Sequence, residues 1–146
     1  MAVLMNREQI MEVIPHRPPF LLIDEINELE PGVRCVATKF IREDDFWFQG
    51  HFPQMPVTPG VLQIEMLAQA GAVAMMVLPQ NRGKIGLFSG IDKAKFRRPV
   101  VPGDVLRLEI AITRNLGRIA VGTGTATVDG AVATSAEMKF VLQAAQ

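Results

Sequence analysis

The sequence predicts an α+β fold in which one long buried helix packs against an antiparallel sheet. The window from Val61 to Leu78 is the most apolar part of the chain, as expected of a central helix. Between residues 105 and 142, apolar and polar side chains alternate with a period of two, which is typical of half-buried strands. The step Asp129-Gly130 interrupts this alternation and indicates a two-residue hairpin turn.

Length and composition indicate a globular protein of one domain. A chain of 146 residues is expected to form a single domain, residues 1–146, with a core of its own. Hydrophobic residues make up 49% of it, which excludes a disordered chain. The 15 Lys and Arg residues balance 15 Asp and Glu, so no overall field draws the protein to nucleic acid or to an anionic membrane. A neutral chain this apolar favours an oligomer.

The N-terminal third predicts a short helix followed by two strands. Asn6 can cap a helix that Pro15 ends. The apolar runs 20–29 and 33–41 are strand candidates, joined by a Glu-Pro-Gly turn. Residues 42–59 then form an irregular stretch that contains three prolines.

The long helix is predicted to begin at a Thr-Pro step. Thr58 suits the N-cap and Pro59 the first helical residue, where a missing N–H costs nothing. Apolar groups surround the helix on nearly every side, so we expect it to be buried. Three polar side chains interrupt it and make it a poor bilayer span: Gln63, Glu65 and Gln69.

The C-terminal half is predicted to be β structure. Leu106, Leu108 and Ile110 alternate with polar residues, which indicates a strand with one wet face. A second strand is expected over 119–128, and the closing strand follows the Asp-Gly turn up to about residue 142.

The candidate chemistry centres on His51 and Glu65. A carboxyl group inside an apolar helix is expected to be neutral, paired or functional, because an isolated buried charge is very costly; a helix position that faces solvent or a subunit cleft is the alternative. Gln69 lies one helical turn further on and can hydrogen-bond the Glu65 carboxyl group. His51 stands in a proline-rich loop that leads into this helix, and a stiff loop suits a group that must stay in place. Histidine and a carboxyl group together are typical of acid/base catalysis.

The start of the same helix offers hydrogen-bond donors. Gly60 lies in the first turn, where backbone N–H groups have no helical acceptor and the helix dipole is positive. Such a helix end suits a developing oxyanion, and a glycine keeps no side chain in the way of a substrate carbonyl.

Metal and nucleotide cofactors are not predicted. Two histidines and one cysteine, without regular spacing, do not make a zinc site. Gly122-Thr123-Gly124 lacks the third glycine and the following helix of a dinucleotide motif. Cys35 lies in a strand candidate, where a buried thiol acts as a small hydrophobe. The lone cysteine and an N-terminus without a signal-peptide pattern favour a reducing cytoplasm.

Cationic side chains gather in one segment. Between residues 81 and 98 the chain has six of them against Asp92 alone. A solvated strand edge would account for this charge, and so would docking of an acidic protein partner by electrostatic steering. The residues that we assign to such docking are Lys93, Lys95, Arg97 and Arg98.

Five segments resemble the (3R)-hydroxyacyl-(acyl carrier protein) dehydratases of the FabZ type, and the likeness extends from about residue 7 to 142. They are Pro15 to Asp24, Gly50 to Pro53, Pro56 to Leu62, Glu65 with Ala68 and Gln69, and Gly90 to Asp104. The resemblance implies the hot-dog fold, with an antiparallel sheet wrapped around a long helix. It also implies a dimer in which each site combines His51 of one subunit with Glu65 of the other, and three such dimers in a hexamer.

The function implied is removal of water from a (3R)-3-hydroxyacyl thioester on acyl carrier protein in type II fatty acid synthesis. His51 would take the α-proton, Gly60 would hold the thioester oxygen, and Glu65 would protonate the leaving hydroxyl or only position water. A hot-dog acyl thioesterase and a non-catalytic acyl-binding module are the alternatives. His16 and Arg17 are assigned structural roles in the turn before the first strand. The acyl tunnel is expected to be lined by Ile64, Met66, Leu87 and Phe88.

Overall fold

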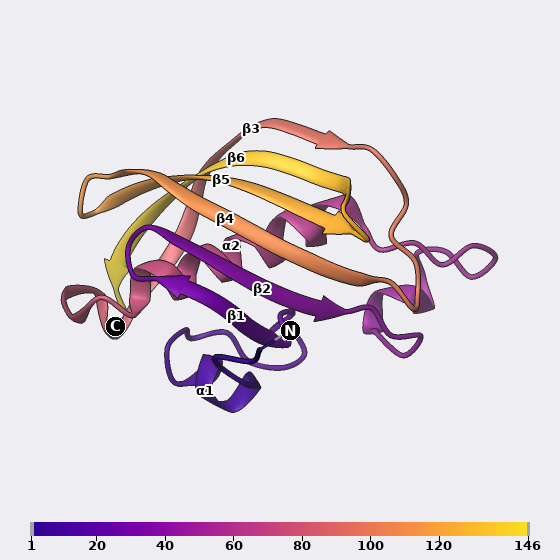
Figure 1. Cartoon of the computed structure of the whole chain (residues 1–146), viewed down its shortest axis with the longest axis horizontal. Helices are drawn as coiled ribbons and strands as arrows, with labels where there is room; N and C mark the ends of the chain where they lie inside the picture. Colours follow the sequence, from indigo (N-terminus) through magenta and orange to yellow (C-terminus); the bar gives the residue numbers. More distant parts are fainter. Residues whose placement is uncertain (1, 146) are drawn as a thin grey trace.

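Residues 2–145, the part of the chain that the computed structural model describes, form one long helix and a six-stranded antiparallel sheet (Figure 1). In chain order the elements are α1 (Arg7–Met11), β1 (Glu25–Glu30), β2 (Arg34–Phe40), the short 3₁₀ helix η1 (Phe46–Gln49), α2 (Gly60–Met76), the 3₁₀ helix η2 (Pro79–Asn81), β3 (Lys84–Phe96), β4 (Val105–Asn115), β5 (Ile119–Val128) and β6 (Ala131–Ala144). The predicted α+β architecture is confirmed.

The strands lie in the order β1-β2-β4-β5-β6-β3. All neighbouring pairs are antiparallel. Helix α2 precedes β3 in the chain, and β3 joins the edge of the sheet beside β6, far from β1 and β2. The sheet therefore has β1 at one edge and β3 at the other.

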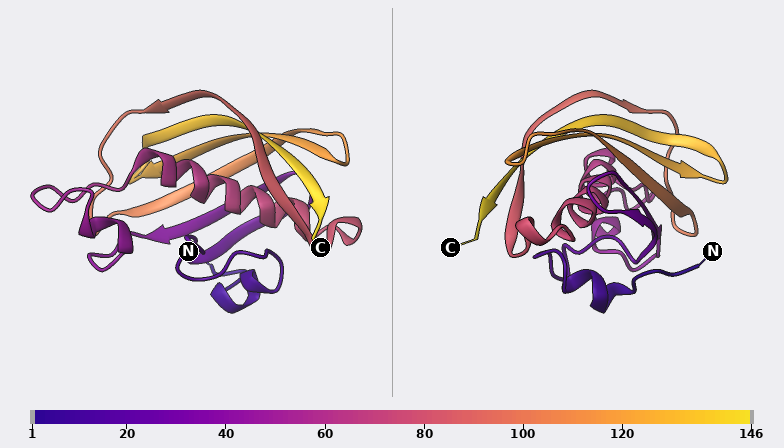
Figure 2. Two further views of the ribbon diagram at one scale, coloured as in Figure 1. Left: turned by 180° about the vertical axis from the view of Figure 1, so that it is seen from behind. Right: turned by 60° about the vertical axis from the view of Figure 1, so that its left-hand side comes forward.

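The sheet curves around α2, which lies along its inner face (Figure 2). Close approach depends on residues without side chains. A Cβ added at Gly71 of the helix would stand 2.9 Å from Ile110 Cδ1 of β4. One added at Gly124 of β5 would stand 2.8 Å from Met138 Cε and 3.1 Å from Leu67 Cδ1 of the helix. These contacts fix the helix against the middle of the sheet.

Several local predictions hold. Asn6 caps α1 in a reciprocal pair of hydrogen bonds with Gln9. Asp129 and Gly130 both have positive φ, as a type I′ turn between β5 and β6 requires. In β4 the side chains of Leu106, Leu108 and Ile110 are fully buried, which confirms the alternation read from the sequence.

Other boundaries differ from expectation. Helix α1 ends at Met11, before Pro15. Strand β1 begins at Glu25 rather than at residue 20, because the backbone of 20–22 is hydrogen-bonded to the side chains of other elements. Strand β3 was not predicted, because its polar, apolar and glycine residues follow no period of two.

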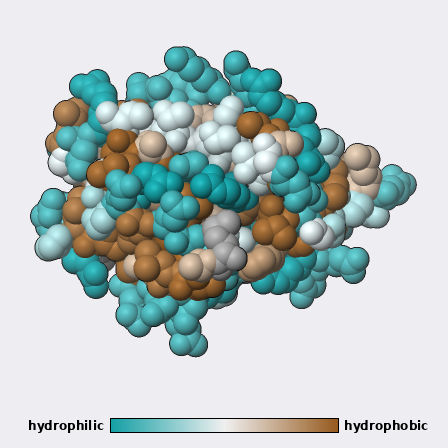
Figure 3. Space-filling model, viewed as in Figure 1, coloured by the Kyte–Doolittle hydropathy of each residue, from teal (hydrophilic) through white to brown (hydrophobic). Residues whose placement is uncertain are grey.

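The outer face of the sheet is polar in its middle, where hydrophilic side chains form a band beside hydrophobic ones (Figure 3). Arg34 of β2 lies 3.0 Å from both Glu28 of β1 and Glu109 of β4. Arg107 adds an ion pair of 2.7 Å to Glu109. Within residues 2–145 we find no helix with the length and hydropathy that a membrane span requires.

Candidate active site

His51 heads a tight loop between η1 and α2. Its Nδ1 lies 2.8 Å from the carbonyl oxygen of Val57, and the Val57 N–H donates to the His51 carbonyl oxygen at 3.0 Å. Phe52 and Met55 pair inside this loop through two further backbone hydrogen bonds. Because a carbonyl oxygen can only accept, the neutral ring carries its proton on Nδ1. The lone pair of Nε2 is therefore available to act as a base.

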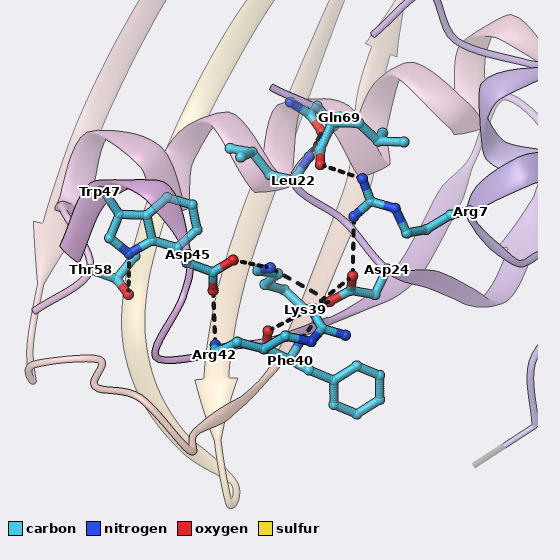
Figure 4. A network of polar contacts seen from close by, with 11 residues as sticks. Arg7, Leu22, Asp24, Lys39, Phe40, Arg42, Asp45, Trp47, Thr58 and Gln69 are labelled. Atoms are coloured by element: carbon cyan, nitrogen blue, oxygen red, sulfur yellow. Dashed lines mark hydrogen bonds and ion pairs between the residues drawn. The ribbon is translucent and has the colours of Figure 1, made fainter. Parts of the chain in front are cut away.

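The start of α2 is held by side chains rather than capped by Thr58. The helix begins at Gly60 with Pro59 as N-cap, one residue later than predicted. The Thr58 hydroxyl accepts a hydrogen bond from the Trp47 indole at 3.2 Å and makes no capping hydrogen bond to the helix (Figure 4). Gln63 donates to the Thr58 carbonyl oxygen at 3.2 Å and accepts from the Thr134 hydroxyl.

Gly60 also packs closely against the end of β3. A Cβ at this residue would lie 2.5 Å from the ring of Phe96, so any side chain here would collide with that ring. The N–H groups of Gly60 and Val61 donate to no acceptor in the described part of the chain. Both donors remain available to a bound anion or carbonyl oxygen.

His51 and Gly60 border one open cleft of about 490 Å³. Phe96 and Arg97, at and just beyond the end of β3, form part of its wall. The other lining residues are Val57, Thr58, Val61, Gln63, Arg98 and Pro99.

Glu65 is half-buried on α2, and Gln69 orients it as predicted. Gln69 Nε2 donates to Glu65 Oε2 at 3.0 Å and to the Phe20 carbonyl oxygen at 2.9 Å. The Gln69 amide oxygen accepts from the Leu22 N–H at 2.9 Å, which fixes the orientation of the amide. Both ends of this buried side chain are therefore occupied.

The segment that holds Gln69 is itself clamped by charged groups (Figure 4). Arg7 donates to the Leu21 carbonyl oxygen and to Asp24 Oδ1, both at 3.2 Å. Asp24 also accepts from the Phe40 N–H at 2.8 Å and pairs with Arg42 at 3.2 Å. This network ties the segment before β1 to the end of β2, so that the backbone partners of Gln69 stay in place.

His16 lies beside Glu65, which the sequence did not indicate. Its Nε2 is 3.6 Å from Glu65 Oε2. Arg17 has the structural role that was predicted, because its guanidinium donates to the carbonyl oxygens of Met11, Ile14 and His16 at 2.7–3.0 Å. His16 and Glu65 are 49 positions apart in the sequence, so no local pattern joins them.

Glu65 and His16 line a narrow cavity of about 40 Å³ that is separate from the His51 cleft. Its remaining lining is apolar and comes from α2, β3 and β6: Ala68, Gly71, Ala72, Met75, Met76, Gly86, Phe88, Phe140 and Leu142. Of the four predicted tunnel residues only Phe88 borders this cavity. Ile64 and Met66 belong to the core, and Leu87 is exposed.

The cationic residues lie at the end of β3. Lys93, Lys95 and Arg97 border a shallow groove, and Arg97 also borders the His51 cleft. Arg98 lines the cleft too, and its guanidinium is 3.7 Å from Asp104. The cationic patch is therefore continuous with the wall of the cleft.

Two further groups bear on the chemistry. Burial raises the pKa of the Cys35 thiol to about 12, so this cysteine is a small hydrophobe, as predicted. Across residues 2–145 no three His, Cys, Asp or Glu side chains lie together in a way that could hold a metal ion.

Comparison with known proteins identifies the family. A family model for FabA-like domains matches residues 14–137. A 3-hydroxyacyl-(acyl-carrier-protein) dehydratase FabZ of Roseiflexus castenholzii is 55% identical over 139 residues, which are 95% of this chain and 97% of the relative. The chain belongs to the FabZ dehydratase family. FabZ of Staphylococcus carnosus is 54% identical over 143 residues, 98% of this chain and 99% of the relative.

Solved structures confirm the hot-dog fold expected of a FabZ-family chain. The dehydratase heterocomplex ApeI:P from Xenorhabdus doucetiae superposes with a TM-score of 0.77 at 17% identity, and the match covers 92% of this chain and 90% of that one. An uncharacterized protein from Pyrococcus horikoshii gives a TM-score of 0.70 at 12% identity, with 98% and 95% covered. At these identities the likeness shows the fold alone.

Proposed function

We propose that the chain catalyses the dehydration of (3R)-3-hydroxyacyl thioesters on acyl carrier protein to trans-2-enoyl thioesters, as a hydro-lyase of fatty acid synthesis. The FabZ dehydratases that it resembles over nearly their whole length carry this activity in their name. An acid/base pair without a metal ion suffices for this reaction, because only protons move between the protein and the substrate.

The reaction assigns a role to each group of the site. His51 Nε2 takes the proton from C2 of the acyl chain. The electron pair of that C–H bond forms the C2–C3 double bond, and the C3–O bond breaks. Glu65 in its acid form gives its proton to the departing hydroxyl, which leaves as water. General acid and base groups of this kind are each worth roughly 10²–10⁴ in rate.

Gly60 supports the step at the thioester oxygen. Negative charge grows on that oxygen while C2 loses its proton, and the N–H groups of Gly60 and Val61 at the start of α2 have no other acceptor in the described chain. A single donor of this type contributes about 10²–10³ to the rate.

The site is complete only when two subunits meet, and one observation carries this proposal. His51 and Glu65 line separate cavities of the single chain, so a substrate held in one cleft does not reach both. We assign the base to His51 of one subunit and the acid to Glu65 of the partner subunit. Strand β3 supports such a dimer, because it is an edge strand with exposed apolar side chains: Leu87, Phe88, Ile91 and Phe96.

The remaining assignments extend the resemblance. The patch of Lys93, Lys95, Arg97 and Arg98 suits docking of the acidic carrier protein, because it adjoins the His51 cleft. A trimer of dimers and a cytoplasmic location stay predictions.

Mixing two inactive variants tests the proposal. His51→Ala and Glu65→Gln should each lower turnover of a 3-hydroxyacyl-carrier-protein thioester by roughly 10²–10⁴, measured as enoyl absorbance and loss of the mass of water. After the two are unfolded together and refolded, half the dimers are mixed, and each mixed dimer has one intact site, so about a quarter of wild-type activity should return. No recovery in confirmed mixed dimers would place both groups in one chain, and free carrier thiol without an enoyl product would indicate a thioesterase.

A further inference from the structure

The polar contacts of His16 are unusual for a histidine in a turn. Its Nδ1 is buried and has no hydrogen-bond partner among the described residues, whereas its Nε2 faces Glu65 Oε2 at 3.6 Å. His16 and Glu65 are the only titratable side chains that line their cavity, according to its described lining. Among the described side chains of this cavity, the carboxyl group is therefore the one polar group that the imidazole faces.

The burial of Nδ1 decides where the ring carries its proton. A proton on Nδ1 would bury an N–H donor without an acceptor, which is costly. Of the two neutral tautomers, the one with the proton on Nε2 is therefore favoured. In that tautomer the N–H belongs to the nitrogen that lies 3.6 Å from Glu65 Oε2.

Gln69 contacts the same carboxylate oxygen as His16. Its amide cannot turn over, because the Leu22 N–H requires the amide oxygen and the Phe20 carbonyl requires the amide nitrogen. Gln69 can therefore only donate to Glu65 Oε2. Two donors therefore face a single oxygen of the Glu65 carboxyl group. The Gln69 amide is fixed by backbone partners, and the His16 ring by the burial of its Nδ1.

We propose that His16 is a positioning residue for the reaction: together with Gln69 it holds Glu65 Oε2 as an acceptor, so that Oε1 carries the proton delivered to the substrate hydroxyl. This inference rests on the proposed function of Glu65 as the acid. A contact of 3.6 Å is long for a hydrogen bond, and hydrogen bonds of catalytic groups commonly tighten when substrate binds.

Kinetics of a matched pair of variants test the proposal. His16→Gln keeps an N–H donor near Nε2, and His16→Leu has a similar volume without a donor. We expect His16→Leu to lower kcat by about 10- to 100-fold with KM within about twofold, because a hydrogen bond to a charged or reacting group is lost. We expect His16→Gln to keep most of kcat. Equal losses in both variants would overturn the inference, since packing alone would then explain them.

A double variant shows whether His16 acts through Glu65. In the Glu65→Gln background, His16→Leu should cause no further loss of kcat, because the group it orients is already absent. Independent, multiplied losses would overturn the inference. If Glu65→Gln itself retains full turnover, the proposed acid is wrong; if Glu65→Gln is impaired and His16→Leu is not, only the role of His16 is wrong.

A measurement on the unmodified protein does not depend on how the variants fold. The chain has two histidines, so the ring ¹⁵N signals of a labelled sample are assigned with a single variant. We expect the Nε2–H tautomer for His16 at neutral pH. A ring with its only proton on Nδ1 would overturn the proposal, because its Nε2 could not donate to Glu65.

Discussion

The two histidines differ in which ring nitrogen has a partner. Val57 offers a carbonyl oxygen to Nδ1 of His51, whereas His16 meets the Glu65 carboxyl group through Nε2. The surroundings thus leave a bare Nε2 on His51, which suits a base, and a protonated Nε2 on His16, which suits a donor. At the scale of the residue, hydrogen-bond partners separate two side chains of the same type into two roles.

Glu109 gives a prediction at the same scale. Hydrogen bonds from Arg107 and Arg34 lower the pKa of its carboxyl group below the ordinary value of 4.5. A carboxyl group whose pKa is lower in the folded state stabilises the fold. This stabilisation is fully present at pH values above the unfolded-state pKa, and it is lost as pH falls through the folded-state pKa. Glu109→Gln should therefore reduce the free energy of unfolding in urea at about pH 7, by less than ~1 kcal/mol because the pair is solvated, and the difference should be smaller at about pH 3. An equal difference at both pH values would refute this.

At the scale of the element, the local pattern of apolar and polar residues was enough to predict a helix or strand wherever one of its faces is buried against the core. The long helix, the β5–β6 turn and the alternation of β4 were all predictable in this way. Strand β3 was not, because it lies at an edge with most of both faces exposed and has no buried face to impose a period. The N-cap of α2 was predicted one residue too early: Thr58 hydrogen-bonds Trp47 of η1, a contact that no local pattern predicts.

The packing of α2 on the sheet gives the second prediction. Gly124→Val would drive its side chain into Met138 and Leu67, so we expect the free energy of unfolding to fall by about 1–3 kcal/mol. Ala111→Val is the control, since Ala111 is exposed on β4. Urea denaturation of both variants checks the prediction, and equal stabilities would show that the helix yields without cost.

The site residues, like the elements of the fold, fall into those that local sequence predicts and those that it does not. His51, Glu65, Gly60 and Gln69 all lie between residues 51 and 69, where their spacing in one loop and one helix could be interpreted from the sequence. His16 precedes the loop and helix and Phe96 follows them, and only the folded sheet brings these two residues to the site. Contacts of that range leave no spacing to recognise in a single sequence.

At the scale of the whole molecule, the exposed apolar side chains of β3 are the clearest indication of a surface that another subunit covers. Leu87, Ile91 and Phe96 are 44–53% exposed on an edge strand, where unpaired backbone groups are open to another strand. Association through this edge would cover those side chains and bring two copies of the site residues together.

A charge on this edge provides the third prediction. Leu87→Glu should weaken self-association by at least about tenfold, because a carboxylate would be buried in the interface. Sedimentation velocity should show the shift toward monomer, and specific activity should fall on dilution in step with it. Leu116→Glu, in the turn between β4 and β5 where the leucine is 61% exposed, is the control and should leave both unchanged. An unaltered Leu87→Glu assembly would place the interface elsewhere.

The partner of His51 Nδ1 is a main-chain oxygen, and every amino acid carries one. No missense mutation at residue 57 deletes that acceptor, so substitutions there leave the hydrogen bond that sets the tautomer of His51 in place. Gln69 holds Glu65 with a side chain, and a single codon change removes it. Under selection by an inhibitor bound in the cleft, residue 57 can therefore vary its side chain and reshape the wall at little catalytic cost. Residue 69 has no such freedom, because its side chain itself forms the contact to Glu65.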